Sequence, residues 1–389
     1  MKVRYKILTH GVGLAVAIAA TTTIPVAICG RGAAKWMDGD VASQLRLSRG
    51  VERLVLAEPL SGSRFRTGSR QFSGEWLFGT YLMAGIGFSQ MAMEHPELRE
   101  QQAALTRQCI DRLLTPEARA TDREMWGEDP IDGIEGNHHH VAYLGYLNFL
   151  LGLHRLASGE TTYADLNDRI TASLIRHLAA SRTGLLESYP GEVYPVDNCF
   201  AIGSIGLHQR VTGQDHHDVI ARWTDQARRH CVDPDTHLLI QALNPEDAAP
   251  ADEPRGSGTA LGLLAVHYAD PQLARDLYRG IKANLARTWL GFGAVREYSK
   301  TRPGHGDIDS GPIIFGYGLS ATGFTIAGAR RYGDQAFFAR LFATAHLCGA
   351  PLDRDGRREY ISGGPLGNAI LFAMLTAPRD QQTHKEDSR

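Results

Sequence analysis

Carboxylic acids stand in two short segments that each precede an apolar, helix-length run. Asp197 lies near the end of the segment at 187–198, and Asp307 and Asp309 lie two residues apart in the glycine-rich segment at 304–312. Side chains two apart in an extended segment share a face, so these two aspartates are expected to lie close together. Neighbouring carboxyl groups raise the pKa of one partner and leave the other ionised, which suits general acid–base catalysis. We therefore take all three aspartates as catalytic candidates.

Helix capping is the competing interpretation of the same residues. Asp197 stands at the start of the apolar run at 197–212, and Asp309 and Ser310 precede Pro312. A side-chain oxygen at such a position commonly accepts a hydrogen bond from the first free amides of a helix. The sequence leaves both interpretations open.

Two glutamates and an arginine extend the set. Glu192 lies in the same segment as Asp197. Glu297 is either an acid in the pocket or the partner of the adjacent Arg296. Arg255 opens another apolar run, where its guanidinium would bind an anionic substrate group or orient one of the carboxylates. Glu192 and Glu297 are therefore further catalytic candidates, and Arg255 is a substrate-binding candidate.

Aromatic residues and histidines are unusually frequent in the same segments. Aromatic faces pack on C–H surfaces while carboxylates and amides bind hydroxyl groups. This composition predicts a pocket for a neutral, hydroxyl-bearing small molecule or glycan. The substrate-binding candidates are Trp76, His139, Tyr194 and His305.

The run His138-His139-His140 invites a metal-site interpretation. Consecutive residues on a helix point in different directions, so the three imidazoles are not expected to bind one ion, and no His-Glu-x-x-His pattern is present. One of the three is expected to reach the pocket. The sequence predicts neither a metal site nor a cofactor.

Helices are the elements that must position these segments. Beyond residue 40, Gly/Ala-rich runs that are apolar nearly all round alternate with runs whose apolar residues follow a helical period. A last apolar run at 365–377 lacks a following partner, and the amphipathic segment at 41–57 would supply it. The five predicted pairs are 74–94 with 97–113, 137–157 with 163–180, 197–212 with 215–231, 256–268 with 271–288, and 311–331 with 334–348.

This alternation predicts an all-α (α/α)6 toroid over residues 36–378, followed by a polar tail at 379–389. Helices that are apolar all round must be buried in an inner ring, and amphipathic helices can cover it from outside. The breaks inside each pair are short, so the longer loops all emerge at one end, where loops over a rigid scaffold commonly carry catalytic groups. A two-domain helical bundle is the alternative.

The N-terminal residues 1–35 differ from the rest. Lys2, Arg4 and Lys6 precede an apolar stretch at 7–29, which is long enough to cross a bilayer core. The basic head predicts a membrane anchor with the following domain on the extracytoplasmic, or periplasmic, side. A cleaved signal peptide is the alternative, and it would give a secreted protein.

Charge and cysteine content exclude other classes. The formal net charge of −2 and the absence of basic runs give no electrostatic footprint for nucleic acid. The five cysteines include no Cys-x-x-Cys pair, which argues against a metal cluster and leaves one or two disulfides open. Nothing in the sequence indicates an oligomeric state.

Several segments resemble the linalool dehydratase/isomerase family, over roughly residues 65–290 and onward to 375. This resemblance implies an (α/α)6 fold, a cofactor-free active site and an exported protein. The residues that carry it are Asp129-Pro130-Ile131, Tyr143-Leu-Gly-Tyr-Leu-Asn148, Gly152-Leu153, Ser158-Gly159, the loop at 190–198, Val266-His267 and Asp270-Pro271.

The catalytic residues of that family do not match. The resemblance places the family's histidine at Tyr146, its paired cysteines at Ser188 and Asp197, and a tyrosine at Ser257. A thiol-based site thus becomes a hydroxyl and carboxylate site, and Tyr146, Ser188 and Ser257 join the substrate-binding candidates. We expect an acid–base lyase, isomerase or glycoside-processing enzyme. A true dehydratase of a small allylic alcohol and a non-catalytic binding or assembly module are the alternatives.

Overall fold

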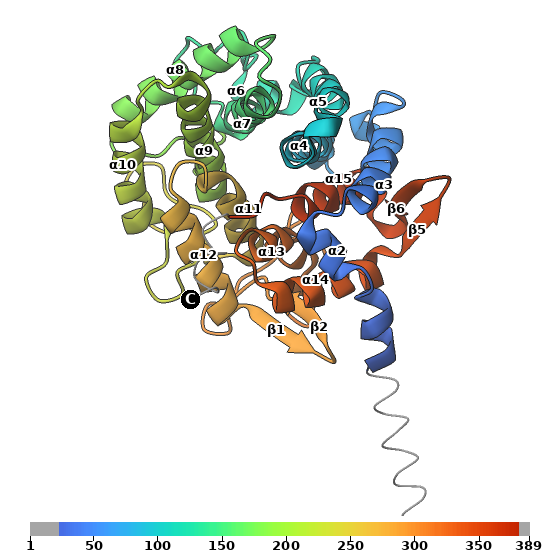
Figure 1. Ribbon diagram of the computed structural model, residues 1–389. Helices are drawn as coiled ribbons and strands as arrows, with labels where there is room; N and C mark the ends of the chain where they lie inside the picture. Colours follow the sequence, from blue (N-terminus) through green and yellow to red (C-terminus); the bar gives the residue numbers. More distant parts are fainter. Residues whose placement is uncertain (1–22, 381–389) are drawn as a thin grey trace, which may run out of the picture.

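The computed structural model describes residues 23–380, which form a closed ring of paired helices (Figure 1). Each inner helix contacts the next, and the last contacts the first, so the ring has no open edge. The six inner helices are α4 (Arg70–Glu94), α7 (Val141–Ser158), α9 (Pro195–Thr212), α11 (Gly256–Val266), α13 (Leu319–Arg331) and α15 (Gly364–Leu375).

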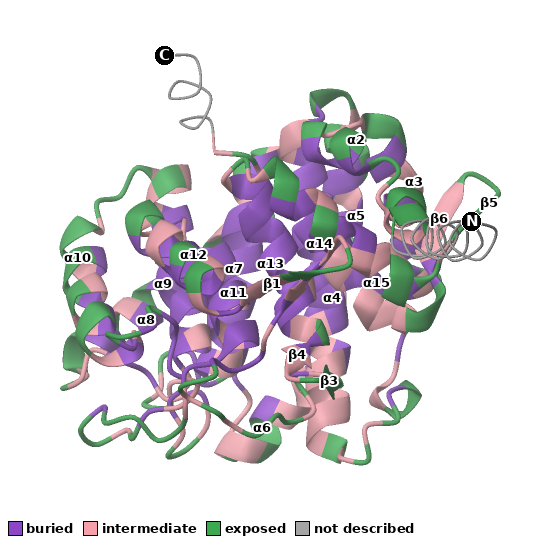
Figure 2. Ribbon diagram, turned by 90° about the horizontal axis from the view of Figure 1, so that it is seen from below, coloured by how far each residue is buried: buried purple, intermediate pink, exposed green. Residues whose placement is uncertain are grey.

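A second set of helices covers the inner ring from outside. Their buried residues recur at helical spacing, and Figure 2 shows buried inner helices beneath outer helices with exposed faces. Helix α3 packs on α15 and supplies the partner that the last inner helix lacks. The predicted (α/α)6 toroid is confirmed. The six outer helices are α5 (Arg99–Leu113), α8 (Ala164–Ala180), α10 (His217–Gln226), α12 (Pro271–Asn284), α14 (Gln335–Gly349) and α3 (Val41–Val51).

Shorter elements fill the connections. Three antiparallel hairpins pair β1 with β2, β3 with β4, and β5 with β6. Two short helices, α2 and α6, and several single turns complete the described chain. Their bounds are α2 (Ala33–Asp38), α6 (Ala120–Trp126), β1 (Ala286–Trp289), β2 (Phe292–Val295), β3 (Ile313–Ile314), β4 (Tyr317–Gly318), β5 (Pro351–Arg354), β6 (Arg357–Tyr360), and the turns Glu52–Leu56, Gly62–Arg64, Pro96–Leu98, Ala227–Cys231 and Ile361–Gly363.

Two predicted helix boundaries are wrong because a hairpin replaces part of the helix, and a third is wrong because the helix predicted at 137–157 begins only at Val141. The helix predicted at 311–331 begins only at Leu319, because the β3–β4 hairpin occupies 313–318. The helix predicted at 271–288 ends at Asn284, and strand β1 follows. In both places the chain pairs its backbone groups in a hairpin at the loop end of the ring.

Glycines set how closely the inner helices approach. A Cβ atom at Gly203 of α9 would lie 2.3 Å from the carbonyl oxygen of Ala265, and one at Gly206 would lie 2.4 Å from that of Tyr268. Any larger residue at these positions would push α9 away from the chain of α11 and the residues after it. The small residues of the apolar runs therefore determine the width of the ring.

The predicted anchor at 7–29 lies largely outside the described residues. Of that segment, only residues 23–29 are described, and they are helical. Within residues 23–380, no helix combines the length and hydropathy that a bilayer crossing requires. All five cysteines are free thiols in the structure.

The helix contact at Gly203 can be tested by substitution. Gly203→Ala is expected to lower the free energy of unfolding by about 1–3 kcal/mol, because its methyl group would overlap a backbone carbonyl. Gly323→Ala in α13 is the matched control, since no heavy atom lies within 4 Å of the added carbon. The control should gain up to about 1 kcal/mol from the helix propensity of alanine. Urea unfolding measures both, and equal effects would contradict the packing described here.

Candidate active site

The predicted acids lie at the end of the ring where the inner helices begin. Trp76 lies in the second turn of α4, Tyr146 in the second turn of α7 and Asp197 in the first turn of α9. Asp309 lies in the loop ahead of α13. The inner helices run in the same direction around the ring, so these four segments meet on one face although they are far apart in sequence.

Asp197 is a buried acid with hydroxyl donors around it. Its Oδ1 accepts a hydrogen bond from the Tyr146 hydroxyl at 2.7 Å, and the Ser188 hydroxyl also donates to the carboxyl group. Burial raises the pKa of Asp197 to about 6; the two hydrogen bonds oppose this shift, and the charge of Asp309 adds to it. Asp197 therefore holds a proton near pH 6, where an ordinary aspartate is ionised.

The capping interpretation of Asp197 does not describe the start of α9. The helix begins with Pro195, which has no amide proton to satisfy, and its N-cap residue Tyr194 makes no side-chain cap. The adjacent Asn198 instead hydrogen-bonds both the amide and the carbonyl of Leu186, at 2.8 and 3.0 Å. These bonds fix the loop that carries Ser188, while the carboxyl group of Asp197 stays available.

Asp309 is the second acid with a raised pKa. Its side chain is accessible to solvent. Partial burial raises the pKa of Asp309 to about 6, the charges of Glu75 and Asp307 contribute, and the Trp76 indole donates a hydrogen bond that opposes the shift. Because the charge of Asp309 also acts on Asp197, these two acids share one electrostatic environment.

Glu75 belongs to the same group and was missed in the sequence. Its Oε1 accepts hydrogen bonds from the Tyr189 hydroxyl at 2.7 Å and from the Gln71 amide at 3.0 Å. Burial raises the pKa of Glu75, and the charges of Asp197 and Glu192 add to the shift. The available signal was its place, since Glu75, like Asp197, lies near the start of a long apolar run that had to be buried.

Glu192 and Tyr194 lie on the rim of this group. The Tyr194 hydroxyl donates to Glu192 Oε2 at 2.8 Å, and both residues are half-buried. The charge of Glu192 reaches Glu75, so Glu192 forms part of the acidic surroundings. We call Glu75, Asp197 and Asp309, whose charges act on one another and whose pKa values are all raised, the carboxyl cluster.

Asp307 and Glu297 are both held by Arg255. Arg255 makes two hydrogen bonds to Asp307, at 2.7 and 2.5 Å, and one to Glu297 at 2.7 Å. Burial favours the neutral form of Asp307, but the hydrogen bonds and charge of Arg255 outweigh it and lower the pKa of this group. The Ser257 hydroxyl also donates to Glu297, at 2.5 Å. This geometry favours a positioning role for the four residues.

The loop around Asp307 differs from the extended segment that was predicted. Asp307 Oδ1 accepts hydrogen bonds from the amides of Asp309 and Ser310, at 2.9 and 3.1 Å, which makes a turn. The Asp307 carboxyl group is thereby fixed toward Arg255, while Asp309 accepts the hydrogen bond from Trp76. Neither Asp309 nor Ser310 caps a helix, because α13 starts at Leu319 after Gly318.

The predicted histidines separate into different environments. His139 is half-buried, and its Nδ1 accepts a hydrogen bond from the Glu187 amide at 3.0 Å, which supports the Asp197 loop. His305 is exposed, and only its carbonyl oxygen is bonded, by the Tyr298 hydroxyl at 2.7 Å. Residues 138–140 are not helical; they precede α7, and His140 is its N-cap residue. The prediction that no metal binds there assumed that the three histidines lie on a helix, and this assumption is wrong.

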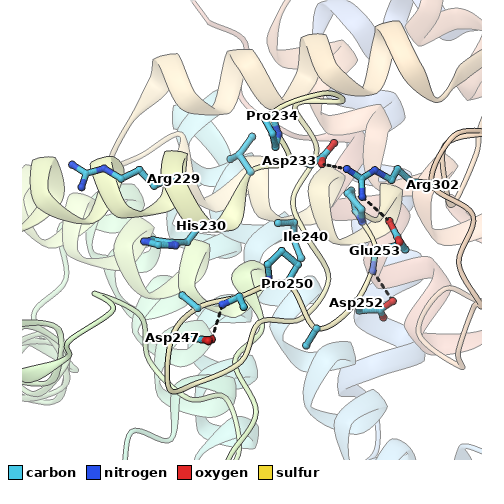
Figure 3. A pocket seen from close by; sticks show the side chains of 15 residues that line it. Arg229, His230, Asp233, Pro234, Ile240, Asp247, Pro250, Asp252, Glu253 and Arg302 are labelled. Atoms are coloured by element: carbon cyan, nitrogen blue, oxygen red, sulfur yellow. Dashed lines mark hydrogen bonds and ion pairs between the residues drawn. The ribbon is translucent and has the colours of Figure 1, made fainter.

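A separate cavity of about 600 Å³ lies beside the loop at 232–254 (Figure 3). Arg302 bridges Asp233 at 3.3 Å and Glu253 at 3.8 Å along its wall. No member of the carboxyl cluster lines this cavity. Asp247 and Asp252, which also line it, accept hydrogen bonds from the backbone amides of Ala249 and Glu253.

Comparison with known proteins supports the fold. No protein-family model matches the chain. One similar structure is an inactive variant of the α-1,6-mannanase GH76A of Salegentibacter sp. HEL1_6 in complex with α-1,6-mannotetrose, with a TM-score of 0.53, 12% identity, and coverage of 88% of this chain and 99% of that chain. Another is the unsaturated glucuronyl hydrolase of Bacillus sp. GL1, with a TM-score of 0.50, 15% identity, and coverage of 88% and 95%.

Identities this low show the fold alone. Both proteins share the (α/α)6 toroid with this chain, in agreement with the ring described above. Neither is a linalool dehydratase/isomerase, and the comparisons give no evidence for that family; they support only the (α/α)6 fold that the resemblance implied. The chain is similar in architecture to these carbohydrate-processing enzymes.

The raised pKa of Asp197 predicts how stability changes with pH. The folded protein keeps this proton up to about pH 6, while the unfolded chain releases it near the ordinary value of 3.8. The unfolded state therefore binds fewer protons across this window, and the wild-type protein loses stability as the pH rises through it. Asparagine does not ionise, so Asp197→Asn lacks this loss. The free energy of unfolding of the variant minus that of wild type should therefore be about 2–3 kcal/mol higher at pH 8 than at pH 4.

Urea unfolding at several pH values measures this difference. Asp235→Asn is the control, because the Asp235 side chain is 77% exposed and its charge stays in water when the protein folds. A constant difference between Asp197→Asn and wild type across this pH range would contradict the burial of the acid.

Proposed function

We propose that this protein is a glycoside-processing enzyme that uses carboxyl groups for general acid–base catalysis. The observation that carries the proposal is the pair Asp197 and Asp309, which come from different inner-helix loops and both have a pKa of about 6. Near that pH one acid can hold a proton while the other is ionised, which is the state that acid–base catalysis requires. The proton-transfer steps need no cofactor.

The surroundings of the two residues suggest which is the general acid and which is the general base. Asp197 is buried, which favours its neutral form, so it would donate a proton to the glycosidic oxygen as the bond to the anomeric carbon breaks. Asp309 is accessible to solvent, so its carboxylate would take a proton from the water that adds to that carbon. Each turnover therefore leaves Asp197 ionised and Asp309 protonated. Proton exchange with solvent returns both residues to their starting state.

The lining of the cluster fits a sugar. Tyr146, Tyr189, Tyr194 and Trp76 surround the acids with aromatic faces and hydroxyl groups. Such faces pack on the C–H surface of a sugar ring while carboxylates bind its hydroxyls. The mannanase complex with mannotetrose and the glucuronyl hydrolase support a glycan substrate by analogy of fold.

Turnover can be tested with labelled oligosaccharides that include α-1,6-linked mannans and unsaturated glucuronyl glycans. Asp197→Asn and Asp309→Asn are each expected to lower kcat by about 10²–10⁴-fold, because each removes one proton-transfer group. Asp235→Asn, at an exposed site, is the matched control and should leave turnover unchanged. Products are measured by chromatography and mass spectrometry.

Other outcomes of the same screen reject the proposal. Full activity in Asp197→Asn would remove this residue from the chemistry. Release of myrcene from linalool would favour the dehydratase alternative. Stabilisation by a glycan without any turnover would favour a binding module.

The pH profile tests the hydrogen bond from Tyr146. Wild-type kcat/KM should peak near pH 6 and fall about tenfold per pH unit well above it, as Asp197 loses its proton. Tyr146→Phe removes a donor that stabilises the ionised form, so the pKa of Asp197 rises and the alkaline limb moves up by roughly one pH unit. The phenylalanine keeps the ring stack on Phe200, whose centroid lies 4.0 Å away.

Tyr143→Phe on the same helix is the matched control. Its hydroxyl donates to the Leu113 carbonyl at 2.8 Å, away from the acids, so its profile should coincide with that of wild type. If both substitutions leave the profile in place, Tyr146 does not set the pKa of the acting acid.

A further inference from the structure

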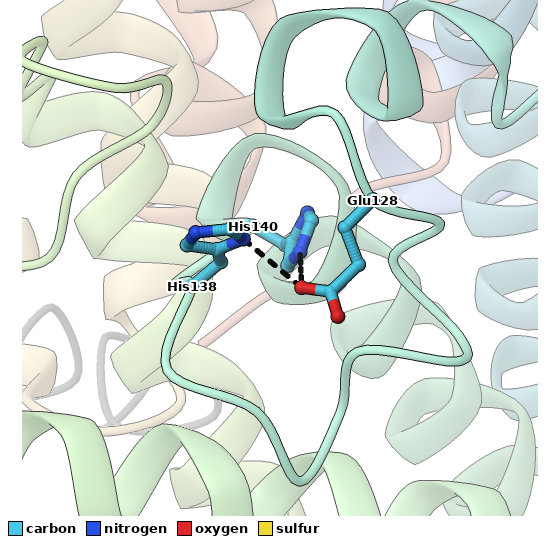
Figure 4. Close-up of side chains that lie close together, drawn as sticks. All are labelled: Glu128, His138 and His140. Atoms are coloured by element: carbon cyan, nitrogen blue, oxygen red, sulfur yellow. Dashed lines mark hydrogen bonds and ion pairs between the residues drawn. The ribbon is translucent and has the colours of Figure 1, made fainter.

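We propose that Glu128, His138 and His140 form a binding site for a divalent transition-metal ion, with zinc as the expected ion. One ligand atom from each side chain lies within 4.8 Å of the other two. Figure 4 shows both imidazoles directed at the same carboxylate oxygen of Glu128. The site lies in the segment between α6 and α7.

His140 is oriented as a metal ligand. It is fully buried, and its Nδ1 is bonded to Asp122 Oδ2 at 2.6 Å. Since the Asp122 carboxylate accepts a hydrogen bond from Nδ1–H, the neutral imidazole carries its lone pair on Nε2. This buried nitrogen has no hydrogen-bond partner among the described residues and lies 3.7 Å from Glu128 Oε2. A carboxylate that fixes the far nitrogen of a histidine is the usual outer-shell arrangement of a metal site.

The separations suit a small ion. His138 Nδ1 lies 2.9 Å from Glu128 Oε2, and His140 Nε2 lies 3.7 Å from the same oxygen. Tetrahedral zinc with bonds near 2.0–2.1 Å places its ligand atoms about 3.3 Å apart. The two measured distances bracket that value, so an ion could enter with small movements of exposed side chains.

The backbone is built to hold the ligands in place. His140 has a φ of 48°, in the left-handed region, which is a costly conformation for a non-glycine residue. A Cβ atom at Gly133 would lie 2.8 Å from Glu128 Oε2, so the loop fits closely around the carboxylate. The Trp126 ring lies 5.1 Å from each of the two imidazoles.

A simple ion pair does not account for these features. A protonated His138 paired with Glu128 would leave His140 Nε2 buried without a partner, at a cost of about 1–3 kcal/mol. Two imidazoles and one carboxylate favour zinc and its neighbours over magnesium or calcium. Three protein ligands leave a position for water.

The ion would stabilise the region next to the carboxyl cluster. Between the two ligands, His139 points the other way and accepts the Glu187 amide at 3.0 Å, at the start of the loop that carries Asp197. Fixing His138 and His140 therefore fixes the residue that supports that loop.

Binding is measured on tag-free full-length protein that has been stripped with EDTA. Zinc titration by calorimetry should show one saturable equivalent, and Co²⁺ should give visible ligand-field absorption. His138→Ala and Glu128→Gln remove partly exposed ligands and should weaken zinc binding by more than the 10–100-fold that the loss of an outer-shell partner typically costs. Asp122→Asn should weaken it by about 10–100-fold with the stoichiometry kept.

His139→Ala is the matched control, since it removes an imidazole from the same tripeptide without removing a ligand. It should keep the wild-type affinity and cobalt spectrum. Circular dichroism checks that each variant is folded, and the two partly exposed ligands serve the test even if His140→Ala is unstable. No saturable zinc binding by the wild type, or unchanged affinity in His138→Ala, would overturn the proposal. Because no substrate is involved, this result is independent of the proposed acid–base function.

Discussion

The closed ring of inner helices is the constraint on which the rest of the structure depends. Because α15 contacts α4, six helices that run in one direction all begin on the same face. Residues as distant as Glu75 and Asp309 can meet there only because the ring closes. Glycine contacts such as that of Gly203 set the width of the ring, and so the separation of the groups at its mouth.

On the face where the inner helices begin, some carboxylates are paired with a cation and others are not. Arg255 neutralises Asp307 and Glu297, and it does so from the start of α11 while both acids lie in later loops. The remaining acids, Asp197, Asp309 and Glu75, have no such cation and carry raised pKa values. The fold thus assigns one group of carboxylates to structure and leaves a second group able to bind protons.

Much of this could be predicted because helix periodicity is a local property. The alternation of apolar and amphipathic runs predicted the ring, its outer partner α3 and the place of Asp197 and Asp309 at the end of the ring where the inner helices begin. Contacts between distant segments have no such local signal. The burial of Glu75, the capture of Asp307 by Arg255 and the hairpin ahead of Leu319 all depend on tertiary packing. His138 and His140 were misjudged because a helix was assumed where the chain is irregular.

The outer helix that completes the ring comes early in the chain, whereas its partner α15 comes late. Beside it, Arg53 hydrogen-bonds Glu359, 306 residues further on. During synthesis on the ribosome, the faces of α3 and α4 that pack on α15 therefore stay without their partner until α15 has been made. The ring therefore closes only after almost all of the chain has been made.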